Sequence, residues 1–270
     1  MIKSKYPSST VFMGSIGNDQ YGEKLKEKIK KDGILDCLYT HNNLQTGVCA
    51  VLLNDDNRCL IPNLGAACVY PDSLINAQWS MIENAERYYT TAYFLETSYK
   101  AVKRASEYAH SKGKPVYFNL GAKKWITKYS EELISVLPNI EGIIGNTEEV
   151  IELSKIISGE ETDIETALRL IMNKQTEKGK RNQFIVATNA HNPTLIAEMS
   201  NQKVSIKQSP TKKIPKELIR TTNGAGDTLA GGLLGGLIAG LDLMTSLKLG
   251  QKLAFHYIQQ ADESFSPTSL

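Results

Sequence analysis

The chain has 270 residues, of which 31 are basic and 29 acidic, giving a formal net charge of +2. This near balance gives no support for a protein that binds nucleic acid or an anionic membrane surface. The hydrophobic fraction of 41% and the charged fraction of 22% are ordinary for a soluble globular protein. The length suits one large α/β domain, or one domain with a small appendage.

Cysteine usage and the apolar runs predict the compartment. The four cysteines form no CxxC pair and have no histidine at metal-ligand spacing, which indicates free thiols in a reducing compartment. The first residues lack the apolar core of a signal peptide. The longest apolar run, 229–241, is about 13 residues long and too short to cross a bilayer. We therefore expect a cytoplasmic protein, with a nuclear pool as the alternative, and a monomer with neither membrane nor nucleic acid as partner.

The first half of the chain contains both kinds of periodicity. The segment 21–32 predicts a helix that Gly33 ends. Further expected elements are a strand at 48–53 with a turn at 54–57, a helix at 73–85, a β-rich stretch at 87–94, a helix at 98–111 and a strand at 115–120. Strands without an intervening helix between 37 and 67 indicate a small sheet, a partial lid, lying off the main body.

The second half alternates more regularly. We expect helices at 129–137, 147–157, 164–176, 224–239 and 243–260, and strands at 142–146, 184–188, 194–199 and 204–208, the last as an antiparallel edge. Such alternation predicts a mostly parallel sheet covered by helices on both faces. The prediction is one α/β domain over 1–270, with the lid elements as its appendage.

A glycine turn precedes the helix at 224–239. Gly224 and Gly226 let the backbone approach an anion, which free N–H groups at the helix start would hold. Asp227 would then lie beside that anion, where a carboxylate can take a proton from an attacking hydroxyl during phosphoryl transfer. The alternative is an ordinary loop-to-helix junction with a first-turn acid and glycines that serve close helix packing.

The strings around this turn resemble a known family. Thr222-Asn223-Gly224-Ala225-Gly226-Asp227 is similar to the signature of the ribokinase-like carbohydrate and nucleoside kinases, and within them the adenosine kinases. The resemblance runs from about Val11 to Phe265, and its further strings are 13–19, 45–50, 56–58, 63–67, 93–95, 118–120 and 145–149. It implies a three-layer α/β/α kinase fold with a mostly parallel central sheet and a small β lid.

The resemblance also implies roles for matching residues. Asp227 would be the base that activates the 5′-hydroxyl of adenosine, with Gly224, Ala225 and Gly226 as the anion hole. Substrates would be adenosine and ATP, with Mg²⁺, and the product AMP, in purine salvage. Asn146 and Glu149 match a motif that orders Mg²⁺ and phosphate largely through water, and without the family Glu149 is a plain first-turn acid.

The other implied positions are less specific. Arg58 resembles the lid arginine that approaches the phosphates, or else is an exposed turn residue. Phe94 resembles an aromatic wall of the adenosine pocket, or else is a core strand residue. The remaining assignments are Gln45 for adenosine, and Thr188, Asn223 and Gln251 for the nucleotide.

Several positions depart from the family pattern. Thr221 stands where an aspartate is usual, Ala190 follows the nucleotide strand near a usual glycine, and Gln251 replaces a histidine. Residues 262–263 are Asp-Glu where Gly-Cys is usual. We also expect residues 1–10 to be too few for the family's ribose-binding strand and helix start, so that a truncated chain, a short form with altered activity, or a second chain that fills the gap are all open.

Three functions follow from these observations. The first is an adenosine kinase-like phosphotransferase. The second is a catalytically impaired or inactive relative that binds a nucleotide or a partner, since the departures collect on the ATP side. The third is a kinase of the same fold that acts on another small substrate, such as a sugar.

Overall fold

The computed structural model describes residues 9–54, 57–176, 182–200 and 203–260, with only the backbone of residues 53–54 and 57–58. The chain forms two compact units: one of residues 86–93 and 106–270, the other of residues 2–85 and 94–105. Helix α5 (Ala92–Ser111) contributes to both. Each unit is described by itself.

The larger unit is built on a six-stranded sheet in the order β10-β9-β8-β7-β6-β5. Strands β5 to β8 are parallel, whereas β9 and β10 are antiparallel additions at one edge. The strands are β5 (Tyr88–Thr91), β6 (Val116–Asn119), β7 (Gly142–Asn146), β8 (Phe184–Asn189), β9 (Asn192–Ser200) and β10 (Lys203–Ser209). The predicted mostly parallel sheet and its antiparallel edge at 204–208 are confirmed.

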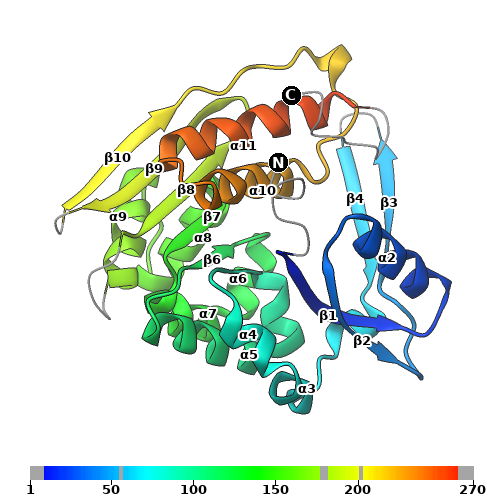
Figure 1. Cartoon of the computed structure of the whole chain (residues 1–270). Coiled ribbons are helices and arrows are strands. Elements are labelled where there is room, and N and C mark those ends of the chain that lie inside the picture. The colour runs from blue at the N-terminus through cyan, green and yellow to red at the C-terminus, as the bar shows by residue number, and fades with distance from the viewer. Residues whose placement is uncertain (1–8, 55–56, 177–181, 201–202, 261–270) are drawn as a thin grey trace. The chain divides into compact units, whose positions relative to one another are not determined.

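Helices cover both faces of this sheet (Figure 1). On one face α8 and α9 contact β7, β8 and β9. On the other, α10 and α11 bury Leu229, Leu233 and Leu247 against Ile144 and Val186. The helices of the larger unit are α6 (Lys123–Lys128), α7 (Ser130–Val136), α8 (Thr147–Ser158), α9 (Ile164–Gln175), α10 (Ala225–Ile238) and α11 (Leu243–Ile258), with short 3-10 turns η2 (Leu137–Asn139) and η4 (Lys216–Leu218).

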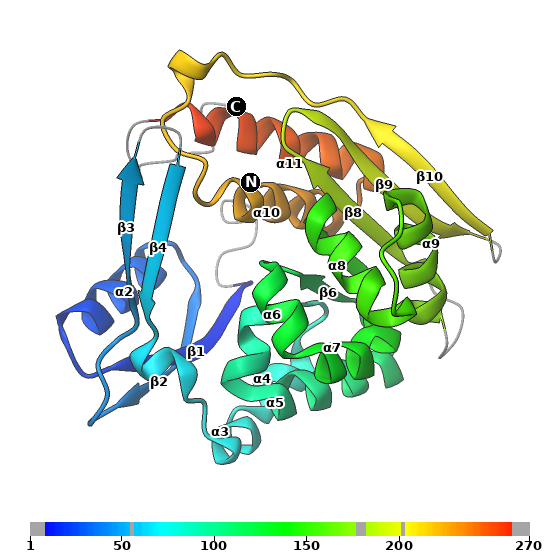
Figure 2. The same cartoon turned by 180° about the vertical axis from the view of Figure 1, so that it is seen from behind.

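The smaller unit holds two two-stranded sheets. In one, β1 and β2 are parallel and joined through α2; in the other, β3 and β4 form an antiparallel hairpin, seen in Figure 2. The elements are β1 (Val11–Gly17), α2 (Gln20–Lys31), β2 (Leu35–His41), β3 (Val48–Asn54), β4 (Asn57–Asn63), η1 (Gly65–Cys68), α3 (Asp72–Ala77) and α4 (Trp79–Asn84). Within the range 37–67 the expected small sheet is the β3–β4 hairpin, whereas β2, which overlaps the start of that range, pairs with β1.

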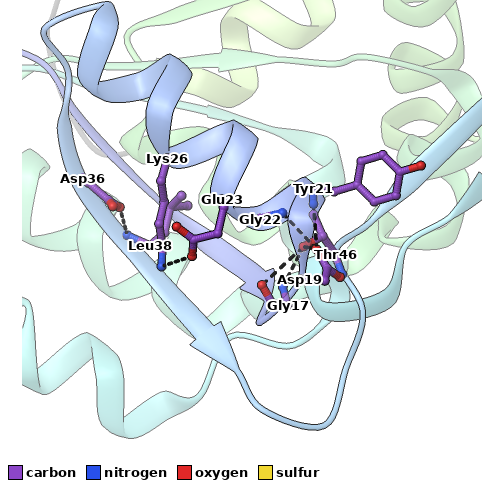
Figure 3. A network of polar contacts seen from close by, with 9 residues as sticks. All are labelled: Gly17, Asp19, Tyr21, Gly22, Glu23, Lys26, Asp36, Leu38 and Thr46. Carbon is purple, nitrogen blue, oxygen red and sulfur yellow. Dashed lines mark hydrogen bonds and ion pairs between the residues drawn. The ribbon is translucent and has the colours of Figure 1, made fainter.

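Side-chain hydrogen bonds at Asp19 fasten this unit (Figure 3). Its Oδ1 accepts from the N–H groups of Tyr21 and Gly22 at 3.1 and 2.9 Å, which caps α2. Its Oδ2 accepts from the N–H of Thr46 at 2.7 Å, and Oδ1 accepts from the hydroxyl of Thr46, also at 2.7 Å. These bonds, led by that from the Thr46 backbone, hold the pKa of Asp19 below its usual value. One carboxylate thus joins the start of α2 to the segment before β3.

Two predictions of local structure need correction. The expected helix at 73–85 is interrupted at Gln78, whose side chain bonds the Tyr70 hydroxyl and the Cys37 carbonyl. The β-rich stretch at 87–94 is a strand only as far as Thr91, because α5 begins at Ala92 and departs from helical geometry at Ser98 (φ −161°, ψ 84°). Phe94 is therefore a helical residue, not a core strand residue. The expected helix at 129–137 is confirmed as α7, whereas α6 before it was not predicted.

Two glycines of α10 allow this helix to pack closely against α11. A Cβ on Gly232 would lie 2.6 Å from the Cα of Gly250, and one on Gly236 would lie 2.6 Å from the Ser246 hydroxyl. No side chain fits there without displacing a helix backbone. The packing alternative for the glycines of this helix therefore holds at Gly232 and Gly236.

Gly231 gives a matched comparison, because a Cβ there would meet nothing within 4 Å. We expect Gly232→Ala to destabilise the chain by about 1–3 kcal/mol through overpacking. Gly231→Ala should instead stabilise it by up to about 1 kcal/mol, since alanine favours a helix. Urea denaturation of both variants checks this; equal effects would contradict the helix contact.

Candidate functional site

The first turn of α10 follows Gly224, whose backbone is in the left-handed region that favours glycine. Gly224 has φ 81° and provides no side-chain cap, and a Cβ there would lie 3.0 Å from the Tyr257 hydroxyl. At a helix start without a cap, the N–H groups of the first residues have no partner within the helix. Here those residues are Ala225, Gly226 and Asp227. The N–H of Ala225 donates to the Thr222 carbonyl at 3.4 Å, and the arrangement leaves the N–H groups of Gly226 and Asp227 for an anion.

Gly226 separates the two interpretations of the glycine turn. A Cβ at Gly226 would meet nothing within 4 Å, so no neighbouring atom requires glycine at this position. Its φ is not in the left-handed region either, unlike that of Gly224. Packing therefore explains Gly232 and Gly236 further along α10, but it does not explain Gly226.

Asp227 lies in the first turn of α10 with its side chain exposed. Protein atoms around the carboxylate displace part of its water, and this desolvation raises the pKa of Asp227 above its usual value. A raised pKa makes the carboxylate a better proton acceptor than a fully hydrated aspartate. The geometry combines a proton acceptor with unsatisfied N–H donors in one helical turn.

A second group of site residues lies at the carboxyl ends of β7 and β8, where Asn146 and Thr188 are register partners. Asn146 caps α8 by accepting from the N–H of Glu149 at 2.8 Å. Glu149 returns two bonds, accepting from the N–H of Asn146 at 3.0 Å and from its side-chain amide at 2.9 Å. Asn146 and Glu149 thus form a capping box at the start of α8. This structural role is close to the alternative in which Glu149 is a plain first-turn acid.

Burial alters the chemistry of Glu149. Its side chain is 7% exposed, and desolvation raises the pKa of Glu149, while the bond from the Asn146 N–H opposes that shift. In the described part of the chain, no three His, Cys, Asp or Glu side chains are grouped to hold a metal directly. One carboxylate beside an amide oxygen suits a hydrated Mg²⁺, which keeps several of its waters.

The remaining nucleotide-side predictions lie apart from this group. Gln251 of α11 accepts from the Ser209 hydroxyl at 2.8 Å, and its amide nitrogen approaches Thr194, Pro210 and Thr211 at 3.2–3.5 Å. Its amide therefore fastens α11 to β9 and to the end of β10. The N–H of Asn223 donates to the Thr221 hydroxyl at 3.1 Å, so threonine makes a local turn bond at the position where the family has an acid.

Ala190 adopts a left-handed backbone (φ 47°) between β8 and β9. Among the described residues other than glycine it alone has a positive φ. Such a conformation costs an L-residue about 1 kcal/mol. The alanine that departs from the family pattern therefore lies in a strained turn, since its side chain disfavours this backbone conformation.

The other predicted residues belong to the smaller unit. The carbonyl of Gln45 accepts from the N–H of Ala66 at 2.8 Å, and the neighbouring Thr46 is fixed by Asp19. Phe94 packs edge-to-face on Tyr70 with ring centroids 5.7 Å apart. Arg58 pairs with Leu53 in the β3–β4 hairpin, and its side chain lies outside the described residues.

Two polar residues near the carboxyl end of the sheet received no role from the sequence. Asn119 ends β6 just as Asn146 ends β7, and its amide donates to the Tyr89 hydroxyl at 3.0 Å. The shared position of the two asparagines, each directly after a short buried strand, was the signal that could have identified Asn119. The hydroxyl partner on β5 could not be read from the sequence.

The comparisons with known proteins decide the family. Residues 4–269 match the model of the pfkB family of carbohydrate kinases. The chain belongs to this family. It is 30% identical to the adenosine kinase of Saccharomyces cerevisiae over 94% of this chain and 73% of the relative, and 30% identical to that of Schizosaccharomyces pombe over 98% and 76%.

Solved structures agree with these relatives. Adenosine kinase from Anopheles gambiae, in complex with a di(adenosine) tetraphosphate, has a TM-score of 0.90 at 26% identity, over 95% of this chain and 75% of that one. The enzyme from Schistosoma mansoni with 2-fluoroadenosine has a TM-score of 0.88 at 25% identity, over the same shares. The ribokinase-like fold and the resemblance to adenosine kinases are confirmed, and the family is one of kinases. None of its described helices is long and apolar enough to cross a membrane.

The raised pKa of Asp227 predicts the stability of Asp227→Asn. When the folded pKa lies above the unfolded one, the group stabilises the fold below its unfolded pKa and loses this contribution as the pH rises through the folded pKa. At pH 7 we therefore expect Asp227→Asn to melt at or above the wild-type temperature. That advantage should vanish as the pH falls below about 3.8, the ordinary value for aspartate.

Asp242 is the matched control with the opposite sign. It caps α11, and hydrogen bonds led by that from the Thr245 hydroxyl hold the pKa of Asp242 below its usual value. Asp242→Asn should therefore melt below the wild type at pH 7. Thermal melts across pH compare the three proteins, and a loss of stability in Asp227→Asn at neutral pH would refute the desolvated carboxylate.

Proposed function

We propose that the chain is an adenosine kinase-like phosphotransferase that converts ATP and adenosine to ADP and AMP, in purine salvage. One observation carries the proposal: a desolvated carboxylate, Asp227, shares a helical turn with backbone N–H groups that have no partner within the helix. The names of the sequence relatives supply the substrate. The proposal also includes that the chain acts as a monomer in the cytoplasm.

In the proposed reaction, Asp227 accepts the proton of the adenosine 5′-hydroxyl as its oxygen attacks the γ-phosphorus of ATP. The new bond joins the 5′-oxygen to phosphorus, the bond to the β-phosphate oxygen breaks, and ADP leaves. N–H groups of the segment Gly224 to Gly226 would donate to the oxygens of the transferred group, where charge accumulates. This use of Gly226 accounts for a glycine that packing does not require.

Further residues have proposed roles around this centre. Thr188, Asn223 and Gln251 are assigned to the nucleotide, although the amide of Gln251 is already bonded to β9 and to residues at and beyond the end of β10. Gln45 and Phe94 are assigned to adenosine, and Arg58 to the phosphates. Mg²⁺ would neutralise phosphate charge, and Asn146 with Glu149 would hold its waters.

Asp227→Asn tests the proposed function. Loss of the base should lower kcat for AMP formation by about 10²–10⁴-fold, because the amide cannot take the proton. The measurement is steady-state kinetics with ATP and adenosine, alongside a panel of nucleosides and sugars. Absence of AMP formation by the wild type, or equal turnover in Asp227→Asn, would refute the proposal, whereas turnover on a sugar alone would move the chain to another substrate.

The proposed role of Glu149 has a control on the same helix. Glu149→Gln should raise the Mg²⁺ concentration for half-maximal activity by about tenfold, as outer-shell changes commonly do. Weakening of the capping box should also cost about 1 kcal/mol of stability. Glu148→Gln removes an exposed first-turn acid paired with Lys123 at 2.9 Å and should leave the Mg²⁺ dependence unchanged. Equal Mg²⁺ curves for both variants would remove Glu149 from the metal site.

A further inference from the structure

Two tyrosines hold the turn that follows β6. Asn119, which is 8% exposed, donates from Nδ2 to the Tyr89 hydroxyl at 3.0 Å, and its Oδ1 accepts from the N–H of Gly121 at 3.1 Å. The Tyr93 hydroxyl donates to the carbonyl of Gly121 at 3.3 Å. Each end of this turn is therefore bonded to a phenol from another segment of the chain.

The backbone of the turn has little freedom. Gly121 has φ 71°, and a Cβ there would lie 2.6 Å from the Tyr93 ring. Tyr93 in turn packs edge-to-face on Trp125 of α6, with ring centroids 5.6 Å apart. Because the turn is fixed, the plane of the Asn119 amide depends on the hydrogen bonds of its two ends.

Strand register places this amide on the same face as the candidate site. Thr91 pairs with Asn119, Asn119 with Ile144, and Asn146 with Thr188. Side chains two residues apart share a face of a sheet, so Tyr89, Asn119, Asn146 and Thr188 all lie on the face that α10 covers. They form a polar row along the edge of the apolar core that α10 covers: Tyr89 is level with Tyr117 and Asn119 with Ile144, whereas Asn146 and Thr188 lie two residues beyond Ile144 and Val186.

The charge of Asp227 acts on two tyrosines at this part of the sheet, Tyr89 and Tyr93. Desolvation raises the pKa of both tyrosines. At Tyr89 the Asn119 bond opposes this shift and the Asp227 carboxylate adds to it, whereas at Tyr93 the Glu149 carboxylate and then that of Asp227 add to it. The negative charge of Asp227 therefore favours the protonated Tyr89 phenol. Its oxygen accepts the Asn119 amide, and this leaves the second Nδ2 hydrogen of Asn119 unused by either of its two bonds.

We propose that Tyr89 is a positioning residue for phosphoryl transfer, acting through Asn119. By accepting one amide hydrogen, Tyr89 fixes the amide plane so that the other hydrogen donates to the oxygens of the transferred phosphoryl group. This inference rests on the proposed kinase function. Such a donor strengthens as charge develops, so its loss lowers kcat more than it alters KM for the nucleoside.

A double-mutant cycle tests the inference. Tyr89→Phe keeps the ring and removes the acceptor, and it should lower kcat by about tenfold with KM for adenosine nearly unchanged. Asn119→Ala should lower kcat by about 100-fold, as loss of a charge-stabilising donor does. The double variant should be no slower than Asn119→Ala, because Tyr89 acts only through that amide.

Tyr88→Phe is the matched control, since it makes the same change on the adjacent residue of β5, whose side chain lies on the opposite face. It should leave kcat unchanged, and thermal melts should show all variants folded. If Tyr89→Phe does not fold, Asn119→Asp, which keeps the acceptor for Gly121 and loses the donor, should show the kcat deficit by itself.

The outcomes separate this inference from the proposed function. A wild-type chain without AMP formation overturns both. An active wild type overturns the inference alone if Tyr89→Phe keeps full kcat, if the two single losses multiply in the double variant, or if Tyr88→Phe is equally slow. Full kcat in a folded Asn119→Asp has the same meaning.

Discussion

The close contact between α10 and α11 is the constraint on which the larger unit depends. Gly232 and Gly236 on α10 meet Gly250 and Ser246 on α11 without intervening side chains, so the helix pair packs as one body on the sheet. The same pair contributes Leu229, Leu233 and Leu247 to the core. The first turn of α10, with Asp227, therefore continues directly into the segment that this packing holds.

The sheet provides a complementary arrangement at the carboxyl ends of its parallel strands. The face under α10 changes there from apolar to polar, with Asn119, Asn146 and Thr188 at or near the strand ends and Tyr89 two residues before the end of β5. Asn146 and Glu149 bond each other, and Asn119 is oriented by its bonds to Tyr89 and Gly121. Polar groups that are fixed before a ligand arrives need little reorganisation when charge develops. Phosphoryl-transfer sites rely on such preorganised groups.

Much of this could be predicted from the sequence. Alternating periodicity predicted the sheet and its covering helices, and the Gly224-to-Asp227 turn predicted a helix start with an acid. The residues at which elements end or begin could not be predicted in the same way. Gln78 interrupts a helix because its side chain bonds groups distant in the sequence. Ala92 begins a helix inside a β-rich stretch. Partners such as Tyr89 and Asn119 are 30 residues apart and meet only through strand order. The assignments of Asp227, Arg58, Phe94 and the other site residues remain predictions that the experiments above address.

The bonds of Gln251 have a consequence for how this chain diverged. One amide, as donor and acceptor, joins α11 to Ser209, Thr194, Pro210 and Thr211. An imidazole presents two ring nitrogens on a different outline and cannot reproduce these bonds. Replacement of Gln251 by the histidine of the family pattern would therefore require compensating changes on β9 and after β10. A histidine placed at this single position would lose bonds that hold α11 to β9 and to the segment after β10.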